Sequence, residues 1–301
     1  MKLNEEANNI MICGEKMLRL CSIDEFNRCV DFAYELALDL TKSGYPTYCD
    51  GIKTKAMFVE RSFKAFDRET EQMLLYELEG EVQGLIHCYW IPDDHYLDTC
   101  LFLTNREAEQ AISEFLIYAQ ENFPGYDLFL GFPAENRSAV SFLARQGFEC
   151  IENDYNNTAF LDHLEAIPEN NNIMRINEEN YQSFQRLHSQ IEDDMYWNSE
   201  RIYDDLDNWT ILAKEKDGLP QGAVYYMDAN DGWFEIFGID IDQGGYDPAL
   251  YKELLYAALF DAKRKNGKVM TFFCDEEYEE VASACGFKCV GNYLCYKIHL
   301  A

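Results

Sequence analysis

One order of elements occurs twice in this sequence, and that repeat restricts the folds available to the chain. Residues 74–90 (LLYELEGEVQGLIHCYW) and 210–227 (TILAKEKDGLPQGAVYYM) each read as a strand, a polar turn with glycine, and a second strand opening with Gln-Gly. An acid within an apolar strand follows each pair, Asp98 in YLDTCLFLT and Glu235 in WFEIFGIDI. Repetition of this order predicts one fold used in tandem.

The two copies also end alike and are separated by a break in the pattern. Each finishes with helix, strand, helix and a Gly-Phe turn, at GFECI (147–151) and GFKCV (286–290). Between them, Pro168 and a run of asparagines interrupt the periodicity. We therefore expect an N-terminal domain over residues 1–165 and a C-terminal domain over residues 170–301. The element order predicts an α+β fold, in which helices flank a mostly antiparallel mixed sheet in each half.

The charge balance excludes several classes of partner. Lys and Arg number 25 against 55 Asp and Glu, giving a formal charge of −30, which repels nucleic acid and anionic membranes. The sequence contains no apolar run of signal-peptide or membrane-spanning length, so we expect a cytoplasmic protein. The 11 cysteines form no C-x-x-C pair and the 5 histidines are scattered, so no metal site is expected.

The stretch ENRSAVSFLARQGFEC (135–150) predicts a short amphipathic helix. Its apolar residues recur three and four positions apart, and Gly147 stands where helices commonly end in a left-handed residue. Together with the repeated element order, the spacing N-x-x-A-x-x-F-L-x-x-x-G-F resembles the GNAT superfamily of acyl-CoA-dependent N-acyltransferases. That resemblance covers nearly the whole chain as two tandem copies, and it implies that Asn136 lies near the pantetheine arm of the cofactor.

The resemblance implies acetyl-CoA as co-substrate, with its pyrophosphate on a glycine-containing loop at a helix N-terminus. Neither half has the usual loop signature. In LTNREAEQAISEF, Thr104 and Glu107 predict a capping box that occupies the amides, so the first domain is expected to be degenerate. In IDIDQGGYDPAL the loop stays open to phosphate, although Asp247 could cap the helix instead and leave a simple turn. The cofactor-binding residues implied in this half are Ile239, Ile241, Gln243, Gly244, Gly245, Tyr246 and Ala249, with Asp275 standing in the place of Asn136.

Acylation of an amine needs a base for the ammonium and an acid for the leaving thiolate. Glu235 resembles the base of some family members, and the alternative is that it points to solvent; Asp98 faces the same choice. The usual acid, a tyrosine seven residues after the asparagine, is absent from both halves, and Tyr278 is the nearest substitute. The segment QIEDDMYWNSE (190–200) is acidic and aromatic, which suits either a cationic amine or a solvated helix face.

Two functions remain open from the sequence. The first is an N-acetyltransferase that moves an acyl group from acetyl-CoA to a primary amine of a small molecule or peptide, with its site in the C-terminal half. The alternative is a non-catalytic tandem module of the same fold that binds a ligand or a protein.

Overall fold

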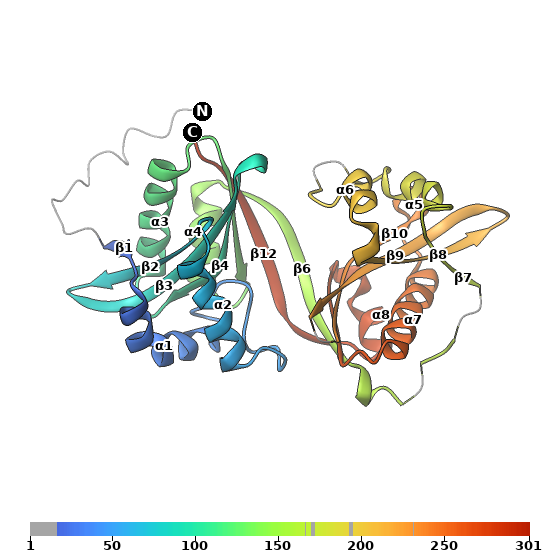
Figure 1. The fold of residues 1–301 in the computed structure, drawn as a ribbon, viewed down its shortest axis with the longest axis horizontal. Coiled ribbons are helices and arrows are strands. Elements are labelled where there is room, and N and C mark those ends of the chain that lie inside the picture. The colour runs from blue at the N-terminus through green and yellow to red at the C-terminus, as the bar shows by residue number, and fades with distance from the viewer. Residues whose placement is uncertain (1–16, 166, 170–171, 193–194, 231) are drawn as a thin grey trace. The chain divides into compact units, whose positions relative to one another are not determined.

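The computed structural model describes residues 17–165, 167–169, 172–192, 195–230 and 232–301. The chain divides into two compact units, one formed by Met1–Asn153 with Tyr293–Ala301 and the other by Asp154–Asn292 (Figure 1). We call them the N-terminal unit and the C-terminal unit, and each is described by itself. None of the helices in the described residues is long and apolar enough to cross a membrane.

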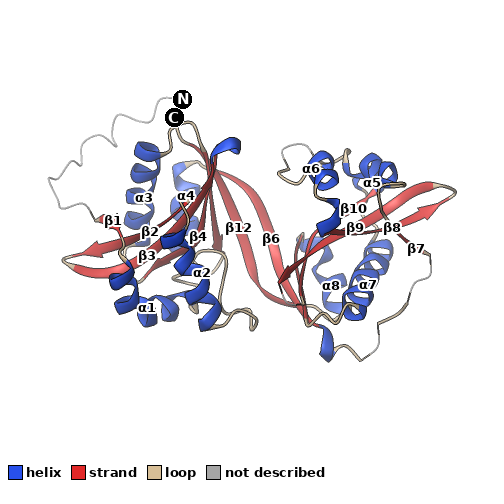
Figure 2. Cartoon of the chain, viewed as in Figure 1, coloured by secondary structure: helices blue, strands red, loops and turns tan. Residues whose placement is uncertain are grey.

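Both units are mixtures of helices and strands, which confirms the α+β prediction (Figure 2). The first half of the chain contains β1 (Leu18–Leu20), α1 (Ile23–Ala37), α2 (Lys55–Asp67), β2 (Glu71–Leu78), β3 (Glu81–Ile91), β4 (Tyr96–Thr104), α3 (Ala108–Asn122), β5 (Asp127–Pro133), α4 (Arg137–Gln146) and β6 (Glu149–Phe160). The second half contains β7 (Ile173–Arg175), α5 (Tyr181–His188), α6 (Ser199–Asp204), β8 (Trp209–Lys216), β9 (Leu219–Asn230), β10 (Trp233–Ile241), α7 (Pro248–Arg264), β11 (Val269–Cys274), α8 (Glu279–Ala284) and β12 (Lys288–His299).

The last strand of each sequence half completes the sheet of the other unit. In the N-terminal unit the strand order is β1-β2-β3-β4-β5-β12, and Tyr293 to His299 of β12 pair antiparallel with β5. In the C-terminal unit the order is β6-β11-β10-β9-β8-β7, and Tyr155 to Phe160 of β6 pair antiparallel with β11. The compact units do not follow the predicted sequence boundary at residues 165–170, because β6 and β12 each join the sheet of the other unit. Residues 1–165 and 170–301 as the two copies of the repeat therefore stay a prediction.

The two sheets share one register, which confirms the tandem fold. Gly84 on β3 lies opposite Thr104 at the end of β4, and Gly222 on β9 lies opposite Ile241 at the end of β10. A Cβ atom on Gly84 would lie 2.4 Å from the Leu103 carbonyl oxygen, and one on Gly222 would lie 2.8 Å from the Asp240 carbonyl oxygen. Because the neighbouring backbone comes too close for a side chain, the Gln-Gly pair recurs for the same steric reason in both copies.

Helices cover both faces of each sheet. In the N-terminal unit, α3 and α4 bury residues such as Phe115 and Leu143 against one face, and α1 and α2 bury residues such as Phe26 and Phe58 against the other. In the C-terminal unit, α7 packs on one face, and α5 and α6 pack on the other. Each large apolar side chain that is fully buried in this way contributes about 1.5–3 kcal/mol. The apolar periodicity of the helices therefore fixes which face of each helix meets the sheet.

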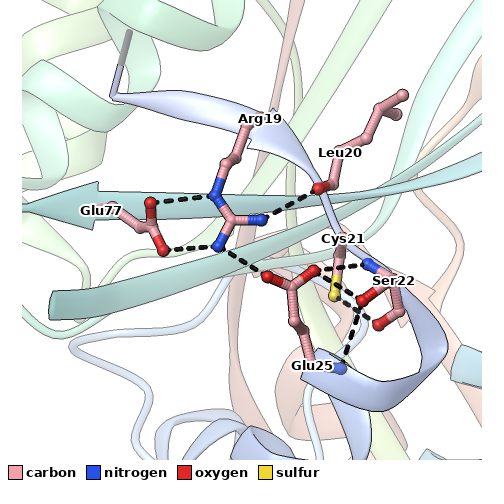
Figure 3. A network of polar contacts seen from close by, with 6 residues as sticks. All are labelled: Arg19, Leu20, Cys21, Ser22, Glu25 and Glu77. Carbon is pink, nitrogen blue, oxygen red and sulfur yellow. Dashed lines mark hydrogen bonds and ion pairs between the residues drawn. The ribbon is translucent and has the colours of Figure 1, made fainter. Parts of the chain in front are cut away.

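A network of hydrogen bonds and ion pairs connects β1, β2 and α1 at the start of the N-terminal unit (Figure 3). Ser22 and Glu25 form a reciprocal capping box at the first turn of α1. The Arg19 guanidinium on β1 donates to both carboxylate oxygens of Glu77 on β2, at 2.9 and 2.7 Å, and also pairs with Glu25 at 2.8 Å. Although the side chain of Arg19 is partly exposed, the network ties β1, β2 and α1 together.

We expect that removal of Tyr293–Ala301 unfolds the N-terminal unit, although these residues are the last in the chain. The truncation deletes the antiparallel partner of β5 together with Tyr296 and Ile298 of the core, while β11 keeps its partner β6. Hydrogen exchange should therefore rise in β2 to β5 and change little in β8 to β11. Deletion of the exposed Ala301 alone is the control, and a loss of protection confined to the C-terminal unit would contradict the strand exchange.

Candidate functional site

Each sheet contains two parallel neighbouring strands, β4 with β5 and β10 with β11, that are hydrogen-bonded to each other over only part of their length. The register between β4 and β5 ends at Asp98 and Phe129, and that between β10 and β11 ends at Ile236 and Phe272. In both units, a β-bulge follows at once in the first strand of the pair. Cys100 is the extra residue in β4 and Phe237 is the extra residue in β10. Beyond the bulge, backbone groups of these strands need partners other than each other.

In the N-terminal unit, a segment of the same unit supplies those partners. The amide of Gly44 donates to the Phe102 carbonyl on β4 at 2.6 Å, and the amide of Tyr45 donates to the Gly131 carbonyl on β5 at 2.8 Å. The Thr104 amide donates to the Lys42 carbonyl at 2.9 Å. Because consecutive residues bond to the two different strands, residues 42–45 lie between β4 and β5. We call residues 42–45 the plug segment.

Asn136 holds the plug segment in place. Its side-chain amide donates to the Ser43 carbonyl at 3.1 Å, while its side-chain oxygen accepts from the Ala139 amide and caps α4. Gly147 ends this helix at φ 77, in the left-handed conformation predicted from the sequence. A Cβ atom on Gly44 would lie 2.9 Å from Cβ of Phe102, so the plug segment fits only with glycine at this position.

The C-terminal unit differs at the equivalent place. β10 continues for five residues beyond its last pairing with β11, from Phe237 to Ile241. Within the described part of this unit, no segment forms a backbone hydrogen bond to Phe237–Ile241 other than the neighbouring strand β9. The edge of β10 that follows the bulge therefore has no such partner among the described residues of this unit, whereas the plug segment occupies the same position in the other unit.

The loops that lead into α3 and α7 also differ. Asp247 caps α7, because its carboxylate accepts from the amides of Ala249 and Leu250 at 3.1 and 3.0 Å. The capping box predicted from Thr104 and Glu107 is wrong: Glu107 has φ 54 and makes no side-chain cap. A left-handed N-cap residue turns its side chain away from the first turn, and the local sequence does not reveal that conformation.

The other predicted cofactor residues surround the start of α7. The Gln243 amide donates to the Gln190 side-chain oxygen at 2.9 Å, and Gln243 and Gly244 both have positive φ, at 62 and 60. Gly245 has an ordinary φ of −75, and Tyr246 is 58% exposed. Ile239 and Ile241 contribute to the core beneath α7, and Asp275 is exposed at the end of β11.

The two predicted catalytic residues of the C-terminal unit lie on different elements. Phe234 and Ile236 point into the core under α7, so Glu235 between them lies on the opposite face of β10, opposite Met227. Phe237 on the same face packs against Trp209 at a ring distance of 5.1 Å. Tyr278 follows β11, is only 7% exposed and stacks on Tyr251 at 3.8 Å. Burial raises the pKa of Tyr278, so its hydroxyl keeps its proton at neutral pH.

The structure also reveals a buried ionic cluster that sequence reasoning missed. On the α2 face of the N-terminal sheet, Glu71 accepts from His87 at 2.7 Å, from Arg61 at 2.5 Å and from Arg68 at 2.8 Å. Although burial opposes ionisation, the hydrogen bonds from His87 and the arginines hold the pKa of Glu71 at about 2. The side-chain atoms of Glu71, His87 and Cys100 that could bind a metal ion lie within 4.8 Å of one another. However, the Arg61 guanidinium also bonds to the Cys100 sulfur. The guanidinium therefore supplies the positive charge that a metal ion would bring.

A second buried pair lies in the C-terminal unit beyond the bulge. His188 on α5 lies 2.9 Å from Asp240 through Nδ1 and 2.9 Å from the Trp197 carbonyl through Nε2. Burial acts to lower the pKa of His188, but the hydrogen bond with Asp240 raises it above its usual value. The pair joins β10 to the segment before α6, whose Asp193 and Asp194 lie outside the described residues. In the sequence, the only signal for these two clusters is a single polar residue within an apolar stretch, His87 in GLIHCYW and Asp240 in IFGIDI. Their partners lie far apart in the chain, so the sequence does not reveal the pairing.

Solved structures with the same architecture are known. The chain matches a GCN5-related N-acetyltransferase from Sphaerobacter thermophilus with a TM-score of 0.60 at 12% identity, covering 93% of this chain and 94% of the other. It matches a tandem GNAT protein from the clavulanic acid biosynthesis pathway with a TM-score of 0.51 at 10% identity, covering 94% and 98%. The chain has the GNAT fold in two copies. No protein-family model matches this sequence, and none of the curated proteins matches it.

In the N-terminal unit, Asp98 occupies the position that Glu235 holds in the C-terminal unit. Asp98 precedes its bulge residue by two positions, as Glu235 does, and it lies opposite Tyr89. Its Oδ2 accepts from the hydroxyls of Tyr96 at 2.9 Å and Tyr89 at 3.2 Å. Burial raises the pKa of Asp98 to about 6, and the hydrogen bonds from Thr99 and the two tyrosines only partly oppose this shift.

We expect Asp98→Asn to stabilise the protein at neutral pH. Because the pKa of Asp98 rises from 3.8 to about 6 on folding, the folded state holds this proton more tightly and stability falls as pH rises through that window. The amide has the same shape and carries no charge. Thermal unfolding should show a higher midpoint for the variant near pH 8 and a smaller difference near pH 4. A difference that is equal at both pH values would show that Asp98 titrates normally.

Proposed function

We propose that the protein is an acyl-CoA-dependent N-acyltransferase that uses acetyl-CoA to acylate a primary amine of a small molecule or peptide. The site of this reaction is assigned to the C-terminal unit. One observation carries the assignment: β10 beyond its bulge has no partner on the β11 side among described residues, whereas the plug segment fills the same position in the N-terminal unit. The fold shared with N-acetyltransferases supports the reaction class.

The residues around β10 and α7 fit an extended acyl-CoA arm in most respects. The edge of β10 from Phe237 to Ile241 offers backbone groups to the amides of a pantetheine chain, as a neighbouring strand would. Gly244 and Gly245 bring the backbone within reach of a pyrophosphate at the start of α7. Asp247 opposes this binding, because its carboxylate already occupies two amides of that helix. We infer that cofactor binding requires Asp247 to release them.

Glu235 is suited to take the proton of the acceptor ammonium. It lies on the same face as Phe237 and Trp209, so the amine would meet a carboxylate beside aromatic rings, which attract cations. In the transfer, a C–N bond forms as the thioester C–S bond breaks, one proton leaves the amine for Glu235, and the thiolate gains a proton. For the last step, Tyr278 is the tyrosine closest in sequence to the position of the family's usual acid, and its raised pKa keeps it protonated.

The charge of the whole chain favours a cationic acceptor. With 55 acidic against 25 basic residues, the surface potential attracts an ammonium ion. Near Phe237, the segment before α6 exposes Ile191, Met195 and Tyr196, at 37%, 42% and 40% of their surfaces. An amine with an apolar body matches these side chains better than a small polar one does.

We expect Gly245→Val to abolish binding of acetyl-CoA without disturbing the fold. A Cβ at this position meets only the Asp242 carbonyl oxygen, at 3.7 Å, but a branched side chain would cover the loop backbone. Wild-type protein should gain about 2.7 kcal/mol of stability at a ligand concentration of about 100 times Kd, and the variant should gain none. Ala108→Val at the start of α3 is the matched control, and it should bind like the wild type. Unchanged affinity in Gly245→Val, or binding that depends on Asn136, would move the site to the N-terminal unit.

We expect Glu235→Gln to lower kcat/KM by about 10² to 10⁴ at neutral pH, the usual contribution of a general base. The deficit should shrink as pH rises, because free amine becomes abundant without help from a base. Affinity for acetyl-CoA should change little, since the variant keeps its shape. Rates equal to wild type between about pH 6 and 9 with an accepted amine would exclude this role.

A non-catalytic binding module is the second candidate, and the Asp247 cap favours it. If the amides of Ala249 and Leu250 stay bound to Asp247, no pyrophosphate can use them. Acetyl-CoA would then leave the unfolding temperature of the wild-type protein unchanged at millimolar concentration. That single result separates the two functions before any acceptor is known.

A further inference from the structure

Asp98 in the N-terminal unit is a carboxylate with no ion-pair partner in the described part of the chain. The buried carboxylates of Asp50, Glu71 and Asp240 each pair with a basic side chain. Among the described residues, Asp98 takes part in no ion pair, and the groups that set its pKa are its own burial and neutral hydrogen-bond donors. A carboxylate that is partly withdrawn from water without a counter-ion is destabilised in its charged form, so a cation brought by a ligand would be favoured there.

The hydrogen-bonding capacity of Asp98 is nearly exhausted. A carboxylate has about four lone-pair positions. Tyr96 and Tyr89 donate to Oδ2 at 2.9 and 3.2 Å, and the Thr99 amide donates to Oδ1 at 2.6 Å. A primary ammonium would bring three N–H donors to a group that has room for about one. The site therefore matches a cation that donates few hydrogen bonds.

Aromatic rings surround this carboxylate. The Tyr96 ring stacks on Phe129 at 4.6 Å and lies 6.0 Å from the Tyr89 ring. Tyr293 on β12 packs over Gly131 of β5, where an added Cβ atom would lie 2.4 Å from its ring. The Tyr293 ring lies 4.7 Å from that of Tyr45 in the plug segment. We call Tyr89, Asp98, Tyr96, Phe129 and Tyr293 the tyrosine cluster; each of these residues keeps some exposed surface.

The nearby basic side chains are engaged elsewhere. Lys297 lies over the Phe129 ring at 5.8 Å, which shows that this part of the cluster accepts an ammonium, but its Nζ pairs with Asp127 at 3.0 Å. Arg61 pairs with Glu71 and Cys100. Negative charge and ring faces thus lie together with no protein cation to neutralise Asp98, which is the arrangement that recognises alkylated ammonium ions.

We propose that the tyrosine cluster binds an organic ammonium ion whose nitrogen carries methyl groups. The ligand sits against the carboxylate of Asp98 and the faces of the tyrosine rings. A quaternary nitrogen has no N–H to be acylated, and the plug segment fills the space between β4 and β5 in this unit. This ligand is therefore distinct from an acyl acceptor, and the inference does not depend on the proposed acyltransferase activity.

Calorimetric titration of the full chain tests the proposal with three related alcohols: choline, its uncharged isostere neohexyl alcohol, and ethanolamine, the primary amine that lacks the N-methyl groups. Choline should bind at least about tenfold more tightly than either of the others. Asp98→Asn should remove choline binding; this variant is expected to be at least as stable as the wild type, so the loss cannot be attributed to unfolding. Glu235→Gln, at the equivalent position of the C-terminal unit, is the matched control and should bind choline like the wild type.

A second variant keeps the charge and removes a ring. Tyr89→Leu should weaken choline binding by about two- to thirtyfold, the range of one cation–π contact. The proposal fails if the wild type does not bind choline, if neohexyl alcohol or ethanolamine binds as tightly, or if Asp98→Asn retains full affinity. It also fails if Glu235→Gln abolishes binding instead, because the ligand would then occupy the C-terminal unit.

Discussion

Backbone groups within a sheet must be hydrogen-bonded, and this requirement distinguishes the two units. In each, a parallel strand pair stops pairing at a β-bulge and leaves the end of one strand without its neighbour. The N-terminal unit satisfies these groups with its own residues 42–45, fixed by Asn136. The C-terminal unit has no such segment in its described residues. The two copies of the fold therefore differ in how this edge of the sheet is completed.

The exchange of final strands makes the two sequence halves interdependent. β5 pairs with β12 and β11 pairs with β6, so neither half forms its complete sheet from its own residues. The pairing of β5 with β12 joins residues more than a hundred positions apart, and closing so long a loop costs conformational entropy before the contact forms. This cost is offset by the core contacts of Tyr296 and Ile298. The N-terminal unit therefore depends on a strand from the other half of the sequence to complete its sheet.

Two neighbouring acids on one sheet show how partners determine the state of a carboxylate. Glu71 is buried among Arg61, Arg68 and His87, and its pKa lies near 2. Asp98 on the same sheet has only tyrosine hydroxyls and a backbone amide, and its pKa lies near 6. Their opposite behaviour results from the side chains near them: α2, β3 and the residue Arg68 bring basic groups to Glu71, whereas β3 and β4 bring neutral donors to Asp98.

The sequence by itself determined the repeat, the α+β class and the local caps, because each depends on residues close together in the chain. The Gln-Gly pairs and the helix from Asn136 to Gly147 could be predicted in this way, and the Asp247 cap was one of two alternatives. The failed capping box at Thr104 and Glu107 shows the limit, since one left-handed residue changes the direction of a side chain. Only the tertiary structure decided that Asn136 holds residues 42–45, that β6 and β12 are exchanged, and that tyrosine hydroxyls and a backbone amide are the groups that bond to Asp98. Those features arise from pairings between distant segments, whose free energy depends on geometry that no local pattern specifies.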